Sequence, residues 1–416
     1  MTCRNLLVTG ACGFVGSTLV RALRAARPDI AITGLDNFVR DGSRANVEPL
    51  RKLGATIVEG DIRNPAHLEA LPQADWVLDC AAEPSVLAGV TGGVSSFDVM
   101  DHNLVGTIRV LEYCKRHGAG LILLSTSRVY SIAPLAALPV EVVDGAYRPR
   151  EFRPDIGLTA AGIDERFPTT PPLSLYGTSK RCSELVALEY ADAFGFPVWI
   201  NRCGVLAGTG QFGKADQGIF TFWIRSWQAG RPLAYIGFDG RGSQVRDCLH
   251  PRDLLPVILR QLDGGSPAAA ANTDNRVLHD KSLRGRTMTS SPLPLGEAGR
   301  RPGEGAGATP TKHPHPGPLP EGEGESASVV ANGTAADSLD PRICNFSGGA
   351  ANAMSLAQLS AWCRERIGPK DIASVAQPRP FDLPWVVLDS GRADRLWGWR
   401  AATPIGAVLQ EILGQG

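Results

Sequence analysis

The sequence predicts an α/β protein built on a doubly wound parallel sheet, with a smaller C-terminal substrate-binding domain beside it. Short apolar runs of strand type alternate with segments of helical periodicity along the first half of the chain. A glycine-rich turn joins the first apolar run to the first helical segment, and polar residues follow several later runs. At 416 residues the chain is long enough to bury a substantial core.

The first strand is expected over Leu6–Val8, and the first helix over Phe14–Ala26. Gly10, Gly13 and Gly16 lie between or just inside these elements with GxxGxxG spacing. Glycines there let the chain turn tightly and let backbone amides approach a pyrophosphate, at which the helix points its positive end. Three glycines alone are a weak signal, but the strand and helix on either side favour a dinucleotide site.

The second strand is expected over Ile30–Leu35 and ends in Asp36, twenty positions past Gly16. This is where the dinucleotide fingerprint places an acid for the ribose hydroxyls. A carboxylate disfavours a 2′-phosphate, so the pattern indicates NAD, although Arg40 nearby keeps NADP open. The alternative is an aspartate that merely ends the strand.

Further strands are expected over Ala55–Val58, Asp75–Asp79 and Gly120–Leu124, with one long helix over Ser96–His117. Ligands of parallel sheets bind beyond the carboxyl ends of the strands. The polar residues that fall at such ends are Asp61, Ser125 and Thr126. These side chains are therefore expected at the binding edge.

A long irregular loop is expected over Ser131–Leu173, followed by a helix from Tyr176 to about Phe194. Tyr176 and Lys180 are four residues apart and share a helical face. A lysine ammonium and a nicotinamide cation would both bring the pKa of the phenol toward neutrality. Thr126 can hydrogen-bond the same substrate hydroxyl. YxxxK is common by chance on helix surfaces, but with the glycine pattern it predicts a catalytic pair.

Together these motifs resemble the extended short-chain dehydrogenase/reductases that act on nucleotide-diphosphate sugars. The resemblance covers about residues 5–262 and 341–412, and rests on TGACGFVGS, LDNFVR, GDIR, NLVGT, STSRVY, YGTSK, VRDCLH and PRPFD. It implies three parts of the chain. These are an NAD-binding Rossmann domain over 1–201 with about 249–262, a sugar-nucleotide-binding domain over 202–248 with 341–416, and a low-complexity insertion over 264–340.

The resemblance also implies a set of site residues. Catalysis falls to Thr126, Tyr176 and Lys180. The positions expected to hold NAD are Gly10, Gly13, Phe14, Val15, Gly16, Asp36, Asn37, Asp61, Ile62, Ala81, Ala82, Asn103, Ser125, Tyr176 and Lys180. The positions expected to hold substrate are Gln211, Gln217, Arg246, Arg379 and Asp382, with the two arginines on the diphosphate and Asp382 on the nucleotide ribose. Guanidinium groups suit a diphosphate because they donate bidentate hydrogen bonds, although each arginine could instead belong to a surface ion pair.

Within this family, the subgroup of CDP-paratose 2-epimerases (CDP-tyvelose epimerases) shares the stretches Gly162–Glu165, Gln211–Gly218 and Gln244–His250. That resemblance implies an NAD-dependent epimerase that oxidises a nucleotide-diphosphate sugar to a keto-sugar and reduces it again on the opposite face. A UDP-sugar 4-epimerase and a non-catalytic NAD-binding regulator remain alternatives. Sugar dehydratases are disfavoured, because Ser127 and Arg128 supply no acid after the catalytic threonine.

Composition excludes several other classes. Lys plus Arg and Asp plus Glu both number 42, so no overall charge attracts nucleic acid or an anionic membrane. No apolar run is long enough to span a bilayer. The nine cysteines are scattered without a CxxC pair, which indicates reduced thiols, a cytoplasmic protein and no metal site. Apolar surface on the helices at 98–117 and 176–194 predicts a homo-oligomer.

The segment 264–340 is rich in proline and glycine and contains an echoed Leu-Pro-x-Gly-Glu-like pattern. Such a segment buries too little apolar surface to offset its ordering entropy, so a disordered insert without function is favoured over a partner-binding segment. Folded-type sequence returns with a strand over Arg342–Phe346. A helix capped by Ser355 and a last helix from about Ile405 are expected after it.

Overall fold

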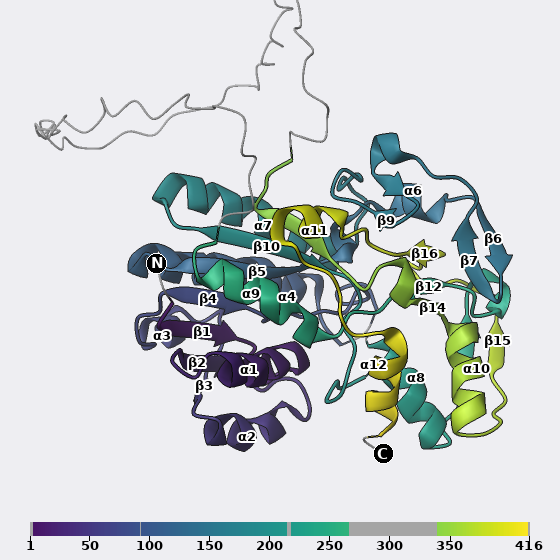
Figure 1. Ribbon diagram of the computed structural model, residues 1–416, viewed down its shortest axis with the longest axis horizontal. Helices are drawn as coiled ribbons and strands as arrows, with labels where there is room; N and C mark the ends of the chain where they lie inside the picture. Colours follow the sequence, from purple (N-terminus) through teal and green to yellow (C-terminus); the bar gives the residue numbers. More distant parts are fainter. Residues whose placement is uncertain (1–2, 92, 214–217, 266–338, 415–416) are drawn as a thin grey trace, which may run out of the picture. The chain divides into compact units, whose positions relative to one another are not determined.

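The computed structural model describes residues 3–91, 93–213, 218–265 and 339–414, all of which belong to one unit. Among them, seven parallel strands form the main sheet in the order β13-β10-β5-β4-β1-β2-β3 (Figure 1). Their bounds are Asn5–Thr9 (β1), Ala31–Asp36 (β2), Thr56–Glu59 (β3), Trp76–Asp79 (β4), Gly120–Thr126 (β5), Val198–Cys203 (β10) and Ile343–Phe346 (β13). The chain winds from β1 to one edge and then to the other, which confirms the doubly wound fold class. The edge strand β13 comes from the stretch that was assigned to the second domain.

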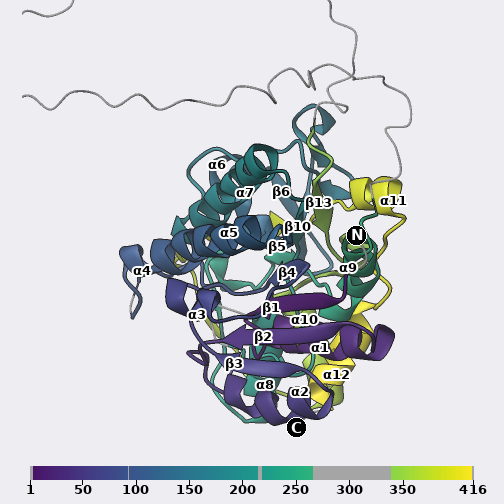
Figure 2. The same ribbon diagram turned by 90° about the vertical axis from the view of Figure 1, so that its left-hand side faces the viewer.

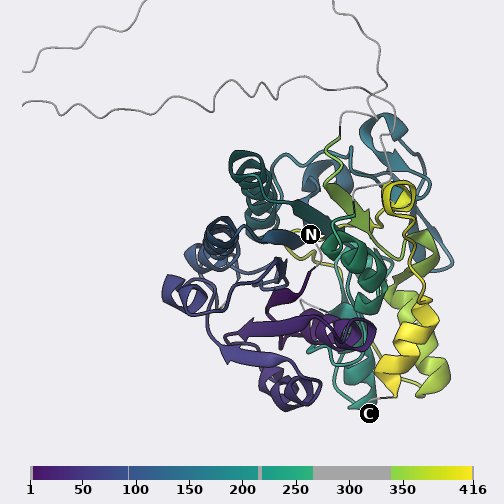
Figure 3. The same cartoon turned by 60° about the vertical axis from the view of Figure 1, so that its left-hand side comes forward.

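Helices cover both faces of this sheet (Figures 2 and 3). On one face lie α1 (Phe14–Ala26) and α9 (Leu255–Leu262), and on the other lie α3 (Pro65–Glu69), α5 (Gly106–His117) and α7 (Leu175–Phe194). Strand residues alternate between the two cores, which is the period-two pattern of a buried strand. In β1, for example, Leu6 and Val8 pack under α1 and α9, whereas Leu7 packs under α5 and α7. Burying each such side chain contributes about 1.5–3 kcal/mol.

The helix expected over Ser96–His117 is interrupted. It consists of α4 (Ser96–Met100), a π-helical turn over Asp101–Val105, and α5. The π turn contains Asn103, whose side chain is buried and bonded to two other segments. Single π turns of this kind are often found at functional sites.

The expectation of an irregular loop over Ser131–Leu173 is wrong in part. This stretch contains α6 (Ile132–Ala136) and a hairpin of β6 (Val140–Val143) with β7 (Ala146–Pro149). Both residues of the hairpin turn, Asp144 and Gly145, have positive φ angles, 47° and 76°. Asp-Gly favours this two-residue turn, so the signal was present in the sequence. A short pair, β8 (Leu158–Thr159) and β9 (Gly162–Ile163), follows.

Smaller sheets lie beyond the carboxyl ends of the main strands (Figure 1). In one, the central strand β12 (Val245–Asp247) pairs with β14 (Ala353–Ser355) and β16 (Trp385–Val386). In the other, β11 (Ala234–Ile236) pairs with β15 (Ala373–Val375). The helices of this region are α8 (Ile219–Gln228), α10 (Leu356–Arg366) and α12 (Ile405–Leu413). Helix α11 (Gly391–Trp397) instead packs on β13 of the main sheet, in the same core as α1 and α9. Ser355 caps α10 as predicted, in a capping box with Gln358.

Nearly all of the predicted insertion 264–340 lies outside the described residues, as does Gln217. Within the described ranges, no helix has the length and hydrophobicity needed to cross a membrane.

Candidate active site

A cavity of about 520 Å³ opens where the main sheet meets the smaller sheets. The predicted site residues that line it are Gly10, Gly13, Phe14, Val15, Gly16, Asp36, Asn37, Ile62, Ala81, Ala82, Ser125, Thr126, Tyr176, Gln211, Arg246, Arg379 and Asp382. Asp61, Asn103 and Lys180 do not line it. The fold therefore brings predicted residues from both ends of the chain to one site.

The glycine turn forms the floor of this cavity. Gly10 has a φ of 60°, and Gly13 is the N-cap of α1 without any side-chain cap. A Cβ atom on Gly16 would lie 2.2 Å from the Gly10 carbonyl oxygen, so no larger residue fits without moving the backbone. The first amides of a helix have no acceptor within the helix. The turn formed by Gly10, Gly13 and Gly16, called the glycine cradle below, leaves room for an anion beside these amides. Its shape fits the pyrophosphate of a dinucleotide.

Asp36 lies at the end of β2 with only 8% of its surface exposed. Its two carboxylate oxygens accept hydrogen bonds of 2.8 Å from the Cys12 and Phe38 amides. Burial raises the pKa of Asp36, and these backbone hydrogen bonds oppose that rise. Since each oxygen can accept a further hydrogen bond, the carboxylate fits the ribose hydroxyls of NAD.

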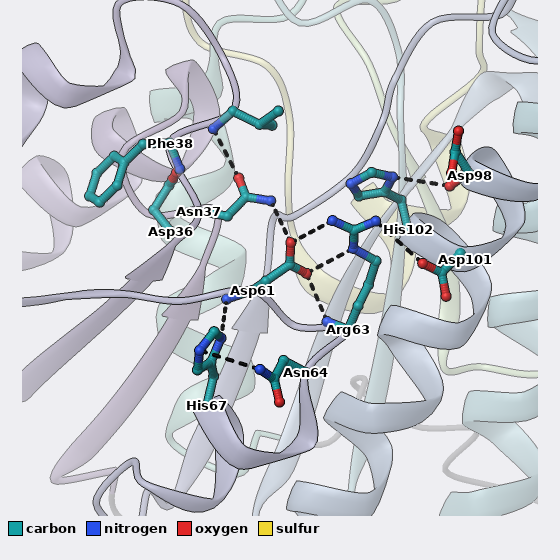
Figure 4. Close-up of polar contacts among 11 residues, drawn as sticks. Asp36, Asn37, Phe38, Asp61, Arg63, Asn64, His67, Asp98, Asp101 and His102 are labelled. Carbon is teal, nitrogen blue, oxygen red and sulfur yellow. Dashed lines mark hydrogen bonds and ion pairs between the residues drawn. The ribbon is translucent and has the colours of Figure 1, made fainter. Parts of the chain in front are cut away.

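Asp61 is held by neighbouring side chains rather than facing the cavity (Figure 4). One oxygen accepts from the Arg63 amide and Nε, and the other accepts from Arg63 Nη2 at 2.7 Å and Asn37 Nδ2 at 3.0 Å. Burial alone would raise the pKa of Asp61, but these donors outweigh it and hold the pKa well below its usual range. Four donors fill the usual capacity of a carboxylate. Asp61 thus orients Asn37, which lines the cavity.

Tyr176 lies in the first turn of α7 and is 8% exposed. Ser174 caps this turn, and Gly177 packs so tightly that a Cβ atom there would lie 2.3 Å from the Arg128 carbonyl oxygen. The Thr126 hydroxyl accepts a 3.2 Å hydrogen bond from the Arg128 amide, and its influence on the Tyr176 phenol opposes the rise in pKa that burial causes. The phenol and Thr126 are therefore oriented together at the end of β5.

The lowering of the Tyr176 pKa by Lys180 and a bound nicotinamide cation stays a prediction. Burial raises the pKa of Tyr176 to about 12, and the opposing influences are the Thr126 hydroxyl and the charge of Arg128. Burial lowers the pKa of Lys180, while the carboxylates of Asp79 and Glu184 raise it. Lys180 is thus placed among buried acids behind the cavity.

The buried face of α7 is polar and anchors the helix to the sheet. Glu184 is fully buried and accepts hydrogen bonds from Ser125 Oγ at 2.6 Å and from Arg202 Nε and Nη2 at 2.9 and 2.7 Å. Sequence reasoning missed this ion pair, although Glu184 follows Lys180 by four residues on the same face. The pair fixes the helix that carries Tyr176 against β5 and β10.

Asn103 connects the cavity wall to the same helix. Its side chain bonds the backbone of Glu83 in both directions, at 2.8 and 3.0 Å, and donates to Ser179 Oγ at 3.1 Å. Predicted as a cofactor ligand, it holds Glu83 and α7 at a fixed separation. Glu83 itself lines the cavity and was not predicted.

The two arginines expected to bind diphosphate meet at one carboxylate. Arg246 Nη2 lies 3.1 Å from Asp382 Oδ1, and Arg379 Nη2 lies 3.5 Å from Asp382 Oδ2. The preceding residue, Phe381, has a φ of 59°, a strained conformation that tends to occur at functional sites. Gln211 lines the cavity, but its amide is bonded to the Leu206 carbonyl and the Thr221 hydroxyl.

Comparisons with known proteins agree with this arrangement. The chain is 27% identical to CDP-paratose 2-epimerase from Salmonella typhi over 62% of its length and 74% of that protein. It is also 31% identical to dTDP-glucose 4,6-dehydratase from Streptomyces antibioticus. That match covers 60% of this chain and 65% of the dehydratase, which is less than two thirds of its length. A crystal structure of UDP-glucuronic acid 4-epimerase from Bacillus cereus, in complex with UDP-glucuronic acid and NAD, aligns with a TM-score of 0.65. That alignment has 18% identity and covers 99% of this chain and 98% of the other.

A family model described as the NAD dependent epimerase/dehydratase family matches residues 6–271, which is more than half of the chain. This stretch includes the glycine cradle, Asp36, Thr126 and Tyr176. The protein therefore belongs to the NAD-dependent epimerase/dehydratase family of extended short-chain dehydrogenase/reductases.

Proposed function

We propose that the protein is an NAD-dependent epimerase of a nucleotide-diphosphate sugar, with a CDP-paratose-like sugar inverted at C2. The observation that carries this proposal is the placement of Tyr176 and Thr126 in one cavity with the glycine cradle and the Arg246–Asp382–Arg379 cluster. The cradle and Asp36 would hold NAD, which when bound supplies hydride acceptance and return at the sugar carbon. The Rossmann and sugar-nucleotide domain boundaries and the cytoplasmic location remain predictions.

Each side chain has a separate task in this mechanism. Thr126 lines the cavity beside Tyr176 and would donate a hydrogen bond to the oxygen of the reacting sugar hydroxyl. Tyr176 accepts the hydroxyl proton during oxidation and gives it back during reduction, as a general base and then acid. Lys180, one helical turn after Tyr176, would favour the phenolate form of that residue, and Glu184 holds α7 against β5 and β10. The arginines fix the diphosphate. The keto-sugar must rotate within the site before it is reduced, so that its opposite face meets the cofactor.

Proton NMR of the purified protein, incubated without added cofactor, tests the proposal. CDP-paratose, UDP-glucose and UDP-glucuronic acid are supplied in separate samples. Inversion at C2 of the CDP-sugar is expected. Inversion at C4 of a UDP-sugar would keep the epimerase and change its substrate, whereas an unchanged spectrum in all three would contradict the proposal.

A UDP-sugar 4-epimerase is the second candidate. The preference for C2 depends on the loop from Gln211 to Gly218, and the Gln211 amide already bonds within the protein. A non-catalytic regulator is less well supported, because Tyr176 and Thr126 line the same cavity. Exposed Leu185 and Phe194 on α7 support the predicted homo-oligomer, which remains a prediction.

Replacing Gly16 with alanine is expected to abolish retention of NAD during purification. The new Cβ atom would lie 2.2 Å from the Gly10 carbonyl oxygen and would push the cradle open. Gly406→Ala is the matched control, because that helical glycine has open space around its Cβ position and alanine favours helices by about 1 kcal/mol. NAD released on denaturation is measured for each protein. Wild-type NAD content in the Gly16 variant would show that the cradle does not bind the cofactor.

A further inference from the structure

We propose that Arg128 is a third arginine of the substrate site and binds the substrate diphosphate together with Arg246 and Arg379. This inference rests on the proposed function and adds a residue to the substrate site. Arg128 follows β5 in the turn over Ser127–Val129, and its side chain lines the same cavity.

The backbone of Arg128 is fixed beside the reactive phenol. Its carbonyl packs against Gly177 and its amide donates to Thr126, so the residue cannot shift without disturbing the start of α7. The guanidinium reaches toward the opposite wall, where Nη1 lies 3.5 Å from the Phe381 carbonyl oxygen. Arg128 therefore spans the cavity from Tyr176 to the loop that carries Asp382.

The charges in this part of the cavity are unbalanced without a ligand. Arg246 and Arg379 share the carboxylate of Asp382, so these three groups carry one net positive charge. A diphosphate that joins a nucleoside to a sugar carries a negative charge on each phosphate. Arg128 supplies the second positive charge that such a ligand requires.

The hydrogen-bond donors of Arg246 are largely used within the protein, whereas those of Arg128 are not. Arg246 Nη1 donates to the Val245 and Leu383 carbonyls at 2.8 and 2.9 Å, and its Nη2 donates to Asp382. Among the described residues, the guanidinium of Arg128 makes a single hydrogen bond, the 3.5 Å contact to Phe381. Most of its donors remain available for a bidentate interaction with phosphate oxygens.

Electrostatics agree with this geometry. The pKa of Arg128 is lowered to about 10, first by burial and then by the charges of Arg246 and Arg379, while Asp382 and Tyr176 oppose this lowering. A buried arginine that only stabilises the fold usually forms an ion pair with a carboxylate. No such pair is found for Arg128 in the part of the chain that the structure describes, and the charges of Arg246 and Arg379 repel it. A bound dianion would relieve that repulsion.

Isothermal titration of the NAD-containing protein with CDP and, separately, with UDP tests this role. Arg128→Gln is expected to weaken binding of the preferred diphosphate at least tenfold, because hydrogen bonds to charged groups are strong. Arg128→Lys should lose less, and cytidine or uridine should bind both proteins equally. The control is Arg400→Gln, whose side chain is 81% exposed, and it should bind as the wild type does.

Unchanged affinity of Arg128→Gln for CDP and UDP would overturn the inference, even if turnover fell. A fall in turnover with unchanged diphosphate affinity would instead indicate that Arg128 acts on the Tyr176 phenol and not on the diphosphate. If Arg128→Gln does not fold, Arg128→Met, which also removes the charge, takes its place, and wild-type affinity of that variant for both diphosphates would overturn the inference equally. Weakened diphosphate binding in a protein that epimerises no sugar would support Arg128 and count against the proposed function.

Discussion

Tyr176→Phe is expected to lower kcat by about a thousandfold while leaving bound NAD in place. The substitution removes one hydroxyl from a buried ring that otherwise keeps its packing. General acid–base groups contribute about 10²–10⁴ to rate, and this phenol acts in both half-reactions. Tyr147→Phe in β7 is a matched control, because that tyrosine does not line the cavity. Turnover is measured by NMR and NAD content by its release on denaturation.

The pH dependence gives a second test of the same residue. Burial raises the pKa of Tyr176 to about 12, so only a small fraction of the phenol is ionised near neutral pH. The rate of wild-type turnover should therefore rise as pH rises, since more of the base form becomes available. Residual activity in Tyr176→Phe should lack this rise. Wild-type turnover in the variant would refute Tyr176 as the base.

Glu184→Gln is expected to reduce the free energy of unfolding by about 3–5 kcal/mol. Arg202 is 3% exposed, and the substitution would leave its charge buried without a counter-ion while preserving the shape of the side chain. The matched control is Glu69→Gln, which breaks the exposed pair with Arg116 and should change stability by no more than about 0.5 kcal/mol. Urea denaturation measures both. A loss under about 1 kcal/mol in Glu184→Gln would contradict the anchoring role of the pair.

Elements with strong local patterns were predictable from the sequence. The helix over Phe14–Ala26 matches α1 at both ends, because its apolar spacing begins directly after the glycine turn. The last helix begins at Ile405 as predicted. The π turn at Asp101–Val105 was not predicted, because a single wider turn inside a longer helical pattern has no residue signature of its own. The hairpin around Asp144-Gly145 was missed although its turn signal was present.

The candidate site was predictable where a short motif carries the chemistry. The glycine cradle, Asp36 and Tyr176 all line the cavity. Long-range partnerships were not predictable, because no local pattern shows that Arg246 and Arg379 share Asp382 or that Glu184 pairs with Arg202. Such contacts are set by the packing of separate elements.

Epimerisation and dehydration differ in what happens to the keto-sugar between its oxidation and the return of hydride. An epimerase that oxidises and reduces within the closed site gives the sugar carbon its own hydrogen back. Elimination of water requires an acid and exchanges a carbon-bound hydrogen with solvent. Glu83 lines the cavity and interacts with Tyr176, so an acid is present near the phenol despite Ser127 and Arg128.

Turnover of the preferred nucleotide sugar in D₂O tests the central claim most directly. The protein is incubated with substrate in D₂O without added cofactor, and the product is examined by proton NMR. Transient oxidation with return of the same hydride predicts that the inverted carbon keeps its protium. Deuterium at that carbon, or a product that has lost water, would contradict the account.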